Sequence, residues 1–152
     1  MIQRIQSLWL LIAAVCAFMS LKFSFYTGNI LASDQAQPVL RNLTGVGLTG
    51  NTGDVKTELN FISLLLVAAT GIVALIAIFM YGNRKMQLRL SIVALITSAL
   101  ALVYLFIRTN DFTDGTMSLT SVFTFLPPVF IFLASRGISK DEKLVKSMDR
   151  LR

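Results

Sequence analysis

Apolar residues along this chain fall into four long runs separated by polar segments. Two of these runs, residues 60–81 and 89–107, flank a short basic hinge at residues 82–88. No Lys, Arg, Asp or Glu occurs between residues 60 and 81 or between residues 90 and 107. At about 1.5 Å per residue, each run matches a hydrocarbon core of about 30 Å. The pattern therefore predicts two membrane-spanning helices joined as a hairpin.

The first and fourth apolar runs, residues 5–26 and 118–135, predict two further spans. A cleavable signal peptide is the competing interpretation of the first run, but the run is too long and no small-x-small cleavage site follows it promptly. Only 14% of the residues are charged, whereas soluble chains carry about 25%. We expect an all-α membrane protein with four transmembrane helices in a single domain.

The first outer loop, residues 28–59, contains a cluster of glycines and is predicted to form a small β-hairpin over the helix ends. Gly45, Gly47 and Gly50 match the spacing of a dinucleotide-binding motif. We reject that interpretation because no long helix is predicted to start at Gly50. The second outer loop, residues 108–117, is short and polar.

Small residues recur at helical spacing within two of the runs, which favours close helix packing. The members of these two faces are Ala13, Ala17 and Ser20, and Ala94, Ser98 and Ala101.

The fourth run contains Pro127 and Pro128, which cannot donate backbone hydrogen bonds. The carbonyl groups of Phe123 and Thr124 therefore lose their helical partners, and a kink is predicted there. The ordinary interpretation is a tolerated membrane proline kink. The alternative is a broken helix that lines a substrate site.

The tail, residues 136–152, is predicted to form a short amphipathic helix after Gly137. Ser139 and Glu142 have the spacing of a capping box. The apolar residues that follow at helical spacing are Leu144, Val145, Met148 and Leu151.

Basic residues are concentrated on one side of the predicted bundle. Ten of the fourteen Lys and Arg residues lie in the two terminal segments, in the hinge or directly after it at Arg89. The positive-inside rule therefore places both termini and the hinge in the cytoplasm. We expect this side to dock a partner, with these candidate residues: Arg84, Lys85, Arg89, Lys140, Lys143, Leu144, Val145, Met148, Arg150 and Leu151.

Groups that commonly carry catalysis or bind metals are scarce in this sequence. It has no His, one cysteine (Cys16), and no acidic residue within a predicted span. Asp111 and Asp114 are expected to be a solvated loop pair. We therefore expect no enzyme activity and no metal or cofactor. We also expect no nucleic-acid binding, because no aromatic residue lies among the cations of the tail.

Three stretches resemble the family catalogued as domain of unknown function 4293. They are the opening residues 1–7, the hinge residues 83–89 and the closing residues 136–152. This family consists of small four-helix inner-membrane proteins typical of Bacteroidota. The resemblance implies a bacterial inner-membrane location and a topology, and no known reaction.

Together these features predict a non-enzymatic membrane scaffold or accessory subunit. Its basic hinge and tail would dock on a membrane or cytoplasmic protein partner, or on anionic lipid headgroups. The alternative is a small-solute transporter or channel that acts as an oligomer, supported by the two prolines and opposed by the lack of ionisable groups within the spans.

Overall fold

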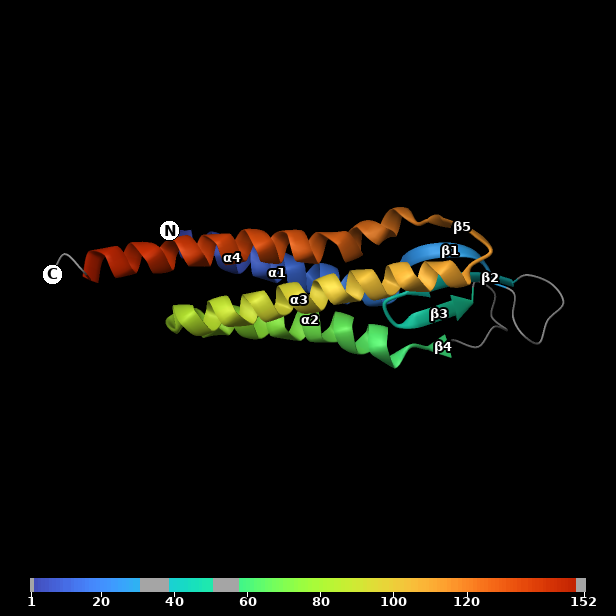
Figure 1. Ribbon diagram of the computed structural model, residues 1–152, viewed down its shortest axis with the longest axis horizontal. Coiled ribbons are helices and arrows are strands. Elements are labelled where there is room, and N and C mark those ends of the chain that lie inside the picture. Colours follow the sequence, from blue (N-terminus) through green and yellow to red (C-terminus); the bar gives the residue numbers. More distant parts are fainter. Residues whose placement is uncertain (1, 31–38, 51–57, 150–152) are drawn as a thin grey trace.

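Four long helices lie side by side in one elongated bundle (Figure 1). The computed structural model describes residues 2–30, 39–50 and 58–149. The helices are α1 (Ile2–Lys22), α2 (Phe61–Phe79), α3 (Arg84–Arg108) and α4 (Val122–Asp149). Helix α1 packs against α2 and α4, and α3 packs against the same two helices. All four are long and apolar enough to cross a membrane, which confirms the predicted number of spans.

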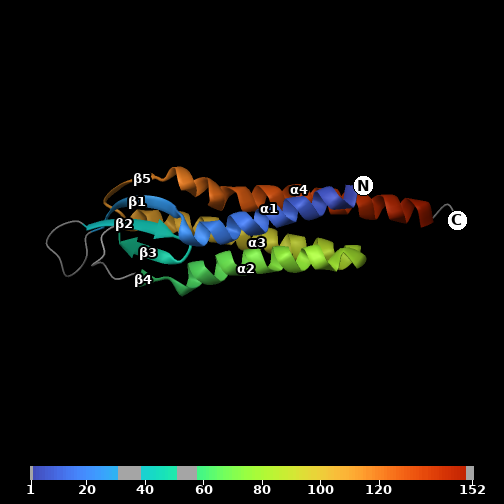
Figure 2. The same cartoon turned by 180° about the vertical axis from the view of Figure 1, so that it is seen from behind.

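A five-stranded antiparallel sheet covers one end of the bundle (Figure 2). The start of α1 and the end of α4 lie at the opposite end. Its order is β4-β3-β2-β1-β5. The strands are β1 (Ser24–Ile30), β2 (Val39–Thr44), β3 (Gly47–Gly50), β4 (Glu58–Leu59) and β5 (Asp114–Met117). The sheet is larger than the predicted hairpin, because it recruits strands from both sides of the first loop and from the second loop.

The first helix ends at Lys22, so the predicted span of residues 5–26 is four residues too long. Residues 24–26 begin strand β1 instead, which pairs with β2 on one side and β5 on the other. Aromatic and β-branched residues such as Phe25, Tyr26 and Thr27 suit a pleated, half-buried strand. Hydropathy alone did not separate this strand from the helix, because both are apolar.

The glycine cluster forms the turn between β2 and β3, not the strand-to-helix turn of a dinucleotide site. Gly45 donates its backbone N–H to the Ser20 carbonyl at the end of α1, at 3.0 Å. A Cβ at Gly45 would lie only 2.8 Å from that oxygen. Gly47 has a φ of 145°, which side chains rarely adopt. Gly45 thus attaches the sheet closely to α1, and Gly47 allows the backbone conformation at the start of β3.

An aromatic cluster joins the sheet to the helix ends. Phe25 of β1 is buried, and its ring lies 5.5 Å from that of Phe106 and 5.9 Å from that of Phe125, between centroids. Leu43 and Leu105 are buried in the same cluster. Such ring pairs contribute beyond their buried area. The sheet is therefore held by side-chain packing on α3 and α4 and not only by its connecting loops.

Small residues face the interior of the bundle, and large apolar residues face outward. Both predicted small faces are buried, which confirms that they form helix–helix contacts: Ala13, Ala17, Ser20, Ala94, Ser98 and Ala101. Residues such as Leu65, Ile96 and Val103 are more than half exposed. This is the distribution that a lipid environment favours, since lipid solvates apolar side chains and close packing holds the helices together.

The connection between α2 and α3 is shorter than the predicted hinge of residues 82–88. A 3-10 turn (Met80–Gly82) leads to Asn83, whose side chain accepts a hydrogen bond from the Met86 backbone N–H at 3.3 Å. This cap starts α3 at Arg84 and not at residue 89. The basic residues of the predicted hinge therefore belong to the first turns of a helix.

Helix α4 is a single helix over 28 residues, and it includes Pro127, Pro128 and Gly137. The prolines do not break it, and the size of the predicted kink stays a prediction. The separate tail helix was a wrong prediction, because Ser139 lies inside α4 and does not cap a new helix. The buried residues Ile131, Ala134 and Ile138 continue one inward stripe across Gly137, so the packing of the bundle extends the helix past this glycine.

The contact between β1 and β5 provides a test of the fold. A Cβ at Gly28 would collide with the Asp114 carbonyl and lie 2.8 Å from Gly115 Cα, both backbone atoms of β5. We expect Gly28→Ala to lower the free energy of unfolding by about 1–3 kcal/mol, measured by thermal unfolding in detergent micelles. Gly82→Ala is the matched control, since no atom lies within 4 Å of a Cβ there. Equal stability of the two variants would contradict the observed β1–β5 packing.

Candidate functional site

The predicted docking residues that the structure describes lie at the end of the bundle farthest from the sheet (Figure 1). Arg84, Lys85 and Arg89 begin α3, whereas Lys140 and Leu144 lie near the end of α4. Lys143, Val145 and Met148 belong to α4, where only the backbone is described, and Arg150 and Leu151 lie outside the described residues. The structure thus brings the hinge and the start of the tail together.

Three polar side chains from three helices meet at this end. The Gln6 Nε2 of α1 donates to Asp141 Oδ2 of α4 at 2.8 Å, and Arg84 Nη1 of α3 lies 3.4 Å from the same oxygen. Gln6 is only 3% exposed, so its amide needs this acceptor. Arg84, a predicted docking residue, therefore pairs with Asp141 in a partly buried contact, where it offsets the charge of Asp141.

Gly137 permits this arrangement. A Cβ at Gly137 would lie 3.0 Å from Gln6 Cγ and 3.1 Å from Gln6 Nε2. Any larger residue would press on the buried amide that bonds Asp141. Gly137 was predicted to separate α4 from a tail helix. It is instead the position where α1 and α4 approach closely.

The sequence reasoning missed Gln6 and Asp141. Asp141 follows Ile131, Ala134 and Ile138 at alternating spacings of three and four residues, so it occupies the next inward position of α4. That periodicity was a usable signal. Gln6 gave no comparable signal, because a polar residue near a helix end usually faces water.

Helix α4 extends beyond the other helices. Asp141 contacts Arg84, the first residue of α3, so residues 142–149 continue past that level. We call residues 142–149 the overhang. It adds about 12 Å of helix at 1.5 Å per residue, and Figure 1 shows it running on in the direction of the bundle. Leu144, in its first turn, is 57% exposed.

Exposed cations surround the base of the overhang. Lys85 and Arg89 are exposed on α3, and Arg136 and Lys140 are exposed on α4. We call these four residues the basic end. The Arg136 guanidinium lies 5.9 Å from the centroid of the Phe132 ring. These side chains present positive charge to whatever approaches the overhang.

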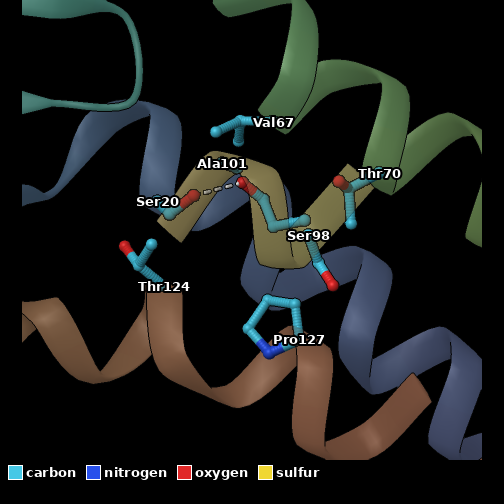
Figure 3. Close-up of a pocket in the computed structure, with 8 residues that line it drawn as sticks. Ser20, Val67, Thr70, Ser98, Ala101, Thr124 and Pro127 are labelled. Carbon is cyan, nitrogen blue, oxygen red and sulfur yellow. Dashed lines mark hydrogen bonds between the residues drawn. The ribbon is translucent and has the colours of Figure 1, made fainter. Parts of the chain in front are cut away.

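The region of the two prolines contains a small cavity inside the bundle (Figure 3). It is lined by Ala17 and Ser20 of α1, Val67 and Thr70 of α2, Ser98 and Ala101 of α3, and Thr124 and Pro127 of α4. About 10 Å³ is open to the centre of a water molecule. The cavity therefore has room for about one water molecule and for no larger solute.

Outside this end of the bundle, the ionisable side chains that the structure describes form no recognisable reaction centre. Among the described residues, no group of three or more His, Cys, Asp or Glu is placed to hold a metal ion. Asp111 forms an ion pair with Arg108, with 2.7 Å between Asp111 Oδ2 and Arg108 Nη1. Asp111 and Asp114 are both exposed. The two aspartates of this loop are thus placed as the sequence suggested, at the surface.

The fold and site define a class of protein: a bundle of four helices apolar enough to span a membrane, with a sheet at one end and a basic helical extension at the other. A family model described as "Domain of unknown function (DUF4293)" matches residues 2–151, so the chain belongs to this family. No curated protein and no solved structure matches the chain.

The Gln6–Asp141–Arg84 contact leads to a second prediction. Asp141→Ala leaves the buried Gln6 amide without its acceptor and Arg84 without its counter-charge. We expect it to lower the free energy of unfolding by about 1–3 kcal/mol. Asp141→Asn, the matched control, keeps an acceptor oxygen and should lose less. Thermal unfolding in detergent measures both, and unchanged stability of Asp141→Ala would show that the contact contributes nothing.

Proposed function

We propose that this protein is a non-enzymatic scaffold or accessory subunit of the bacterial inner membrane. The overhang and the basic end would dock an acidic partner protein in the cytoplasm. The observation that carries the proposal is the continuation of α4 past the start of α3, beside four exposed cations. A helix held this way offers a projecting, positively charged surface outside the bundle.

Charge distribution supports the proposed orientation. Of the eleven Lys and Arg residues that the structure describes, eight lie at the end with the overhang and three lie at the end with the sheet. Cytoplasmic segments of membrane proteins carry such an excess of cations. Both termini would then be cytoplasmic, and the sheet would lie on the periplasmic side.

The direction of the overhang favours a protein partner over a lipid surface. An amphipathic helix that binds headgroups lies in the plane of the membrane. Here the overhang continues α4 along the bundle (Figure 1), which is the direction that crosses the membrane. At 28 residues, α4 spans about 42 Å, against about 30 Å for a hydrocarbon core. Leu144 lies about 33 Å from the start of α4, just beyond the hydrocarbon core, and the last residues of the overhang continue past it.

A small-solute transporter or channel is the second candidate, and less supports it. The cavity at Pro127 includes hydroxyl-bearing residues and involves all four helices, as a transport site would. However, it has room for about one water molecule. Small residues on helix surfaces allow close packing between copies of a membrane protein. Here the small residues of the predicted faces are already buried within the described bundle. An oligomeric channel would therefore have to assemble through large apolar side chains.

The proposed orientation can be tested by cysteine labelling in a Cys16→Ala background. Lys140 and Asn110 are exposed at opposite ends of the bundle. We expect a membrane-impermeant maleimide to label Asn110→Cys in cells with a permeabilised outer membrane. Lys140→Cys should react only after the inner membrane is opened. The reverse pattern would overturn the orientation and the docking surface with it.

The docking proposal can be tested with a chain that stops after Glu142. This truncation removes most of the overhang but keeps Asp141, and so keeps its contacts with Gln6 and Arg84. A second variant, Lys85→Glu/Arg89→Glu, reverses charge at the basic end. For a partner identified by cross-linking and then purified, we expect binding to nanodisc-embedded protein to be lost on truncation. Charge reversal should weaken it at least about tenfold.

The matched control is Lys22→Glu, which reverses an exposed charge at the sheet end of α1. It should leave binding unchanged, and all variants should unfold at temperatures close to that of the wild type. Full binding by the truncated chain would contradict the proposal. Binding that depends on anionic lipid in the nanodisc, and on no protein, would assign the surface to headgroups instead.

A further inference from the structure

The cations that border the apolar stretches of α1 and α3 lie at different heights in the bundle. Helix α1 has no charged residue between Arg4 and Lys22, and α3 has none between Arg89 and Arg108. At about 1.5 Å per residue, these stretches measure about 27 and 29 Å. Each is close to the thickness of a hydrocarbon core, about 30 Å. Their relative heights therefore indicate how the bundle sits in a bilayer.

At the basic end, one contact gives the relative height of α1 and α3, which both run toward the sheet (Figure 1). Gln6 of α1 and Arg84 of α3 both contact Asp141 Oδ2, so they lie at similar heights. The apolar stretch of α1 begins at Arg4, two residues before Gln6. That of α3 begins at Arg89, five residues after Arg84. The two starts differ by seven residues, or about 10 Å of helix.

Contacts near the middle of the bundle agree with this relative height. A Cβ at Gly71 of α2 would lie 2.8 Å from the end of the Phe18 ring of α1. The neighbouring Thr70 Oγ1 lies 3.1 Å from Thr97 Oγ1 of α3. Phe18 and Thr97 are twelve and thirteen residues beyond the residues of α1 and α3 that contact Asp141. The two helices therefore advance together along the bundle.

At the sheet end, the offset has the same direction and nearly the same size. Helix α1 ends at Lys22, sixteen residues after Gln6, and α3 ends at Arg108, twenty-four residues after Arg84. The difference of eight residues is about 12 Å. Figure 1 shows α3 running on beside the sheet past the end of α1. The whole apolar stretch of α1 is thus displaced toward the basic end.

Exposed side chains follow the same displacement. Ile5 and Leu8 of α1 are more than half exposed, at the height where α3 carries the exposed Lys85. At the other end, Ile107 of α3 is 58% exposed and lies well beyond the height of Lys22. An upright bundle in a flat bilayer would leave either such apolar side chains in water or Lys22 inside the hydrocarbon, where a charge is disfavoured.

We propose that the bundle lies tilted in the bilayer, by roughly 25–40°. Helices α1 and α3 occupy opposite corners of the bundle, because each packs on α2 and α4. With neighbouring axes about 8–10 Å apart and helix diameters of about 10–12 Å, these corners are roughly 13 Å apart at their axes and 23 Å at their outer flanks. A displacement of about 11 Å over these distances gives the tilt, which is within the range of membrane helices.

A tilted bundle lets both apolar stretches match the hydrocarbon core at once. Lys22 and Arg108 then lie at one surface of the bilayer, and Arg4 and Arg89 lie at the other. Long basic side chains near helix ends extend to the headgroups, which makes up for the shorter perpendicular span of a tilted helix. The surface that contacts lipid is an oblique band, nearer the basic end on α1 than on α3. Relative heights alone carry this inference, so it holds whichever end faces the cytoplasm.

The tilt can be measured with a spin label on single cysteines of the full chain, in nanodiscs and in the Cys16→Ala background. The relative access of oxygen and of a water-soluble nickel complex reports the depth of each label. The experiment compares labels on α1 and α3 at nearly the same height in the bundle. An upright bundle and a tilted bundle predict opposite orders of depth for such a pair.

The first pair, Met19→Cys on α1 and Leu100→Cys on α3, lies near the sheet, and both side chains are exposed. Met19 is three residues from Lys22, whereas Leu100 is eight residues from Arg108. We expect the Met19 label to lie about 6 Å nearer the membrane surface than the Leu100 label. In an upright bundle, the Leu100 label would be the nearer one, by about 4–5 Å.

The second pair, Ile5→Cys on α1 and Met86→Cys on α3, lies at the basic end, and both side chains are exposed. Ile5 is one residue inside the apolar stretch of α1, whereas Met86 is three residues outside that of α3. We expect the Ile5 label to lie about 5 Å deeper in the bilayer. In an upright bundle, the Met86 label would be the deeper one, by about 4–5 Å.

The tilt requires the expected order in both pairs. The upright order in both pairs would overturn the proposal. The expected order near the sheet alone would assign a local thinning of the bilayer around Lys22 and would also overturn the tilt, as would the expected order at the basic end alone. Ile72→Cys, near the middle of α2, is the control and should carry the deepest label in every case. None of these outcomes depends on a docking partner, so the proposed function is tested separately.

Discussion

Close packing of small residues holds the four helices together, and the rest of the structure depends on it. Within lipid, burying apolar side chains gains little, so helices associate through dispersion contacts and interhelical polar contacts. Alanines such as Ala13, Ala74 and Ala94 are fully buried, and they let the helix backbones approach. Where the helices meet less closely, a small cavity remains that Ser20, Ser98 and Thr124 help to line.

This packing also explains why the ends of the bundle carry the polar features. The exposed flanks consist of large apolar side chains, among them Leu65, Ile96 and Val103, which suit lipid. In the described helices, charged groups lie within about two turns of the ends of the spans, where they can reach water or another side chain. The polar surface of the described chain is therefore concentrated at the sheet and at the basic end.

The sequence was sufficient to predict features that follow from composition and periodicity. Four spans and two buried small faces follow from uninterrupted hydropathy and from spacings of three and four residues. The start of β1 was not predictable in the same way, since Phe25 and Tyr26 extend an apolar run whether the backbone is helix or strand. The continuity of α4 was hidden by Gly137, Ser139 and Glu142, which locally form a good helix start. Packing of Ile138 and Asp141 against neighbouring helices overrides that local signal, and only the three-dimensional structure shows those neighbours.

The same packing determines how well the overhang can serve as a docking element. Helix α4 is held at two places. Near its start, Phe125 contacts Phe25 of the sheet, and nearer its end, Asp141 contacts Gln6 and Arg84. A helix fixed at two points holds its projecting end in a set direction. Binding of the proposed partner would then cost less conformational entropy, because most of the ordering has occurred on folding. A flexible tail joined at Gly137 would have to be ordered by that partner, whereas the continuous helix is already ordered.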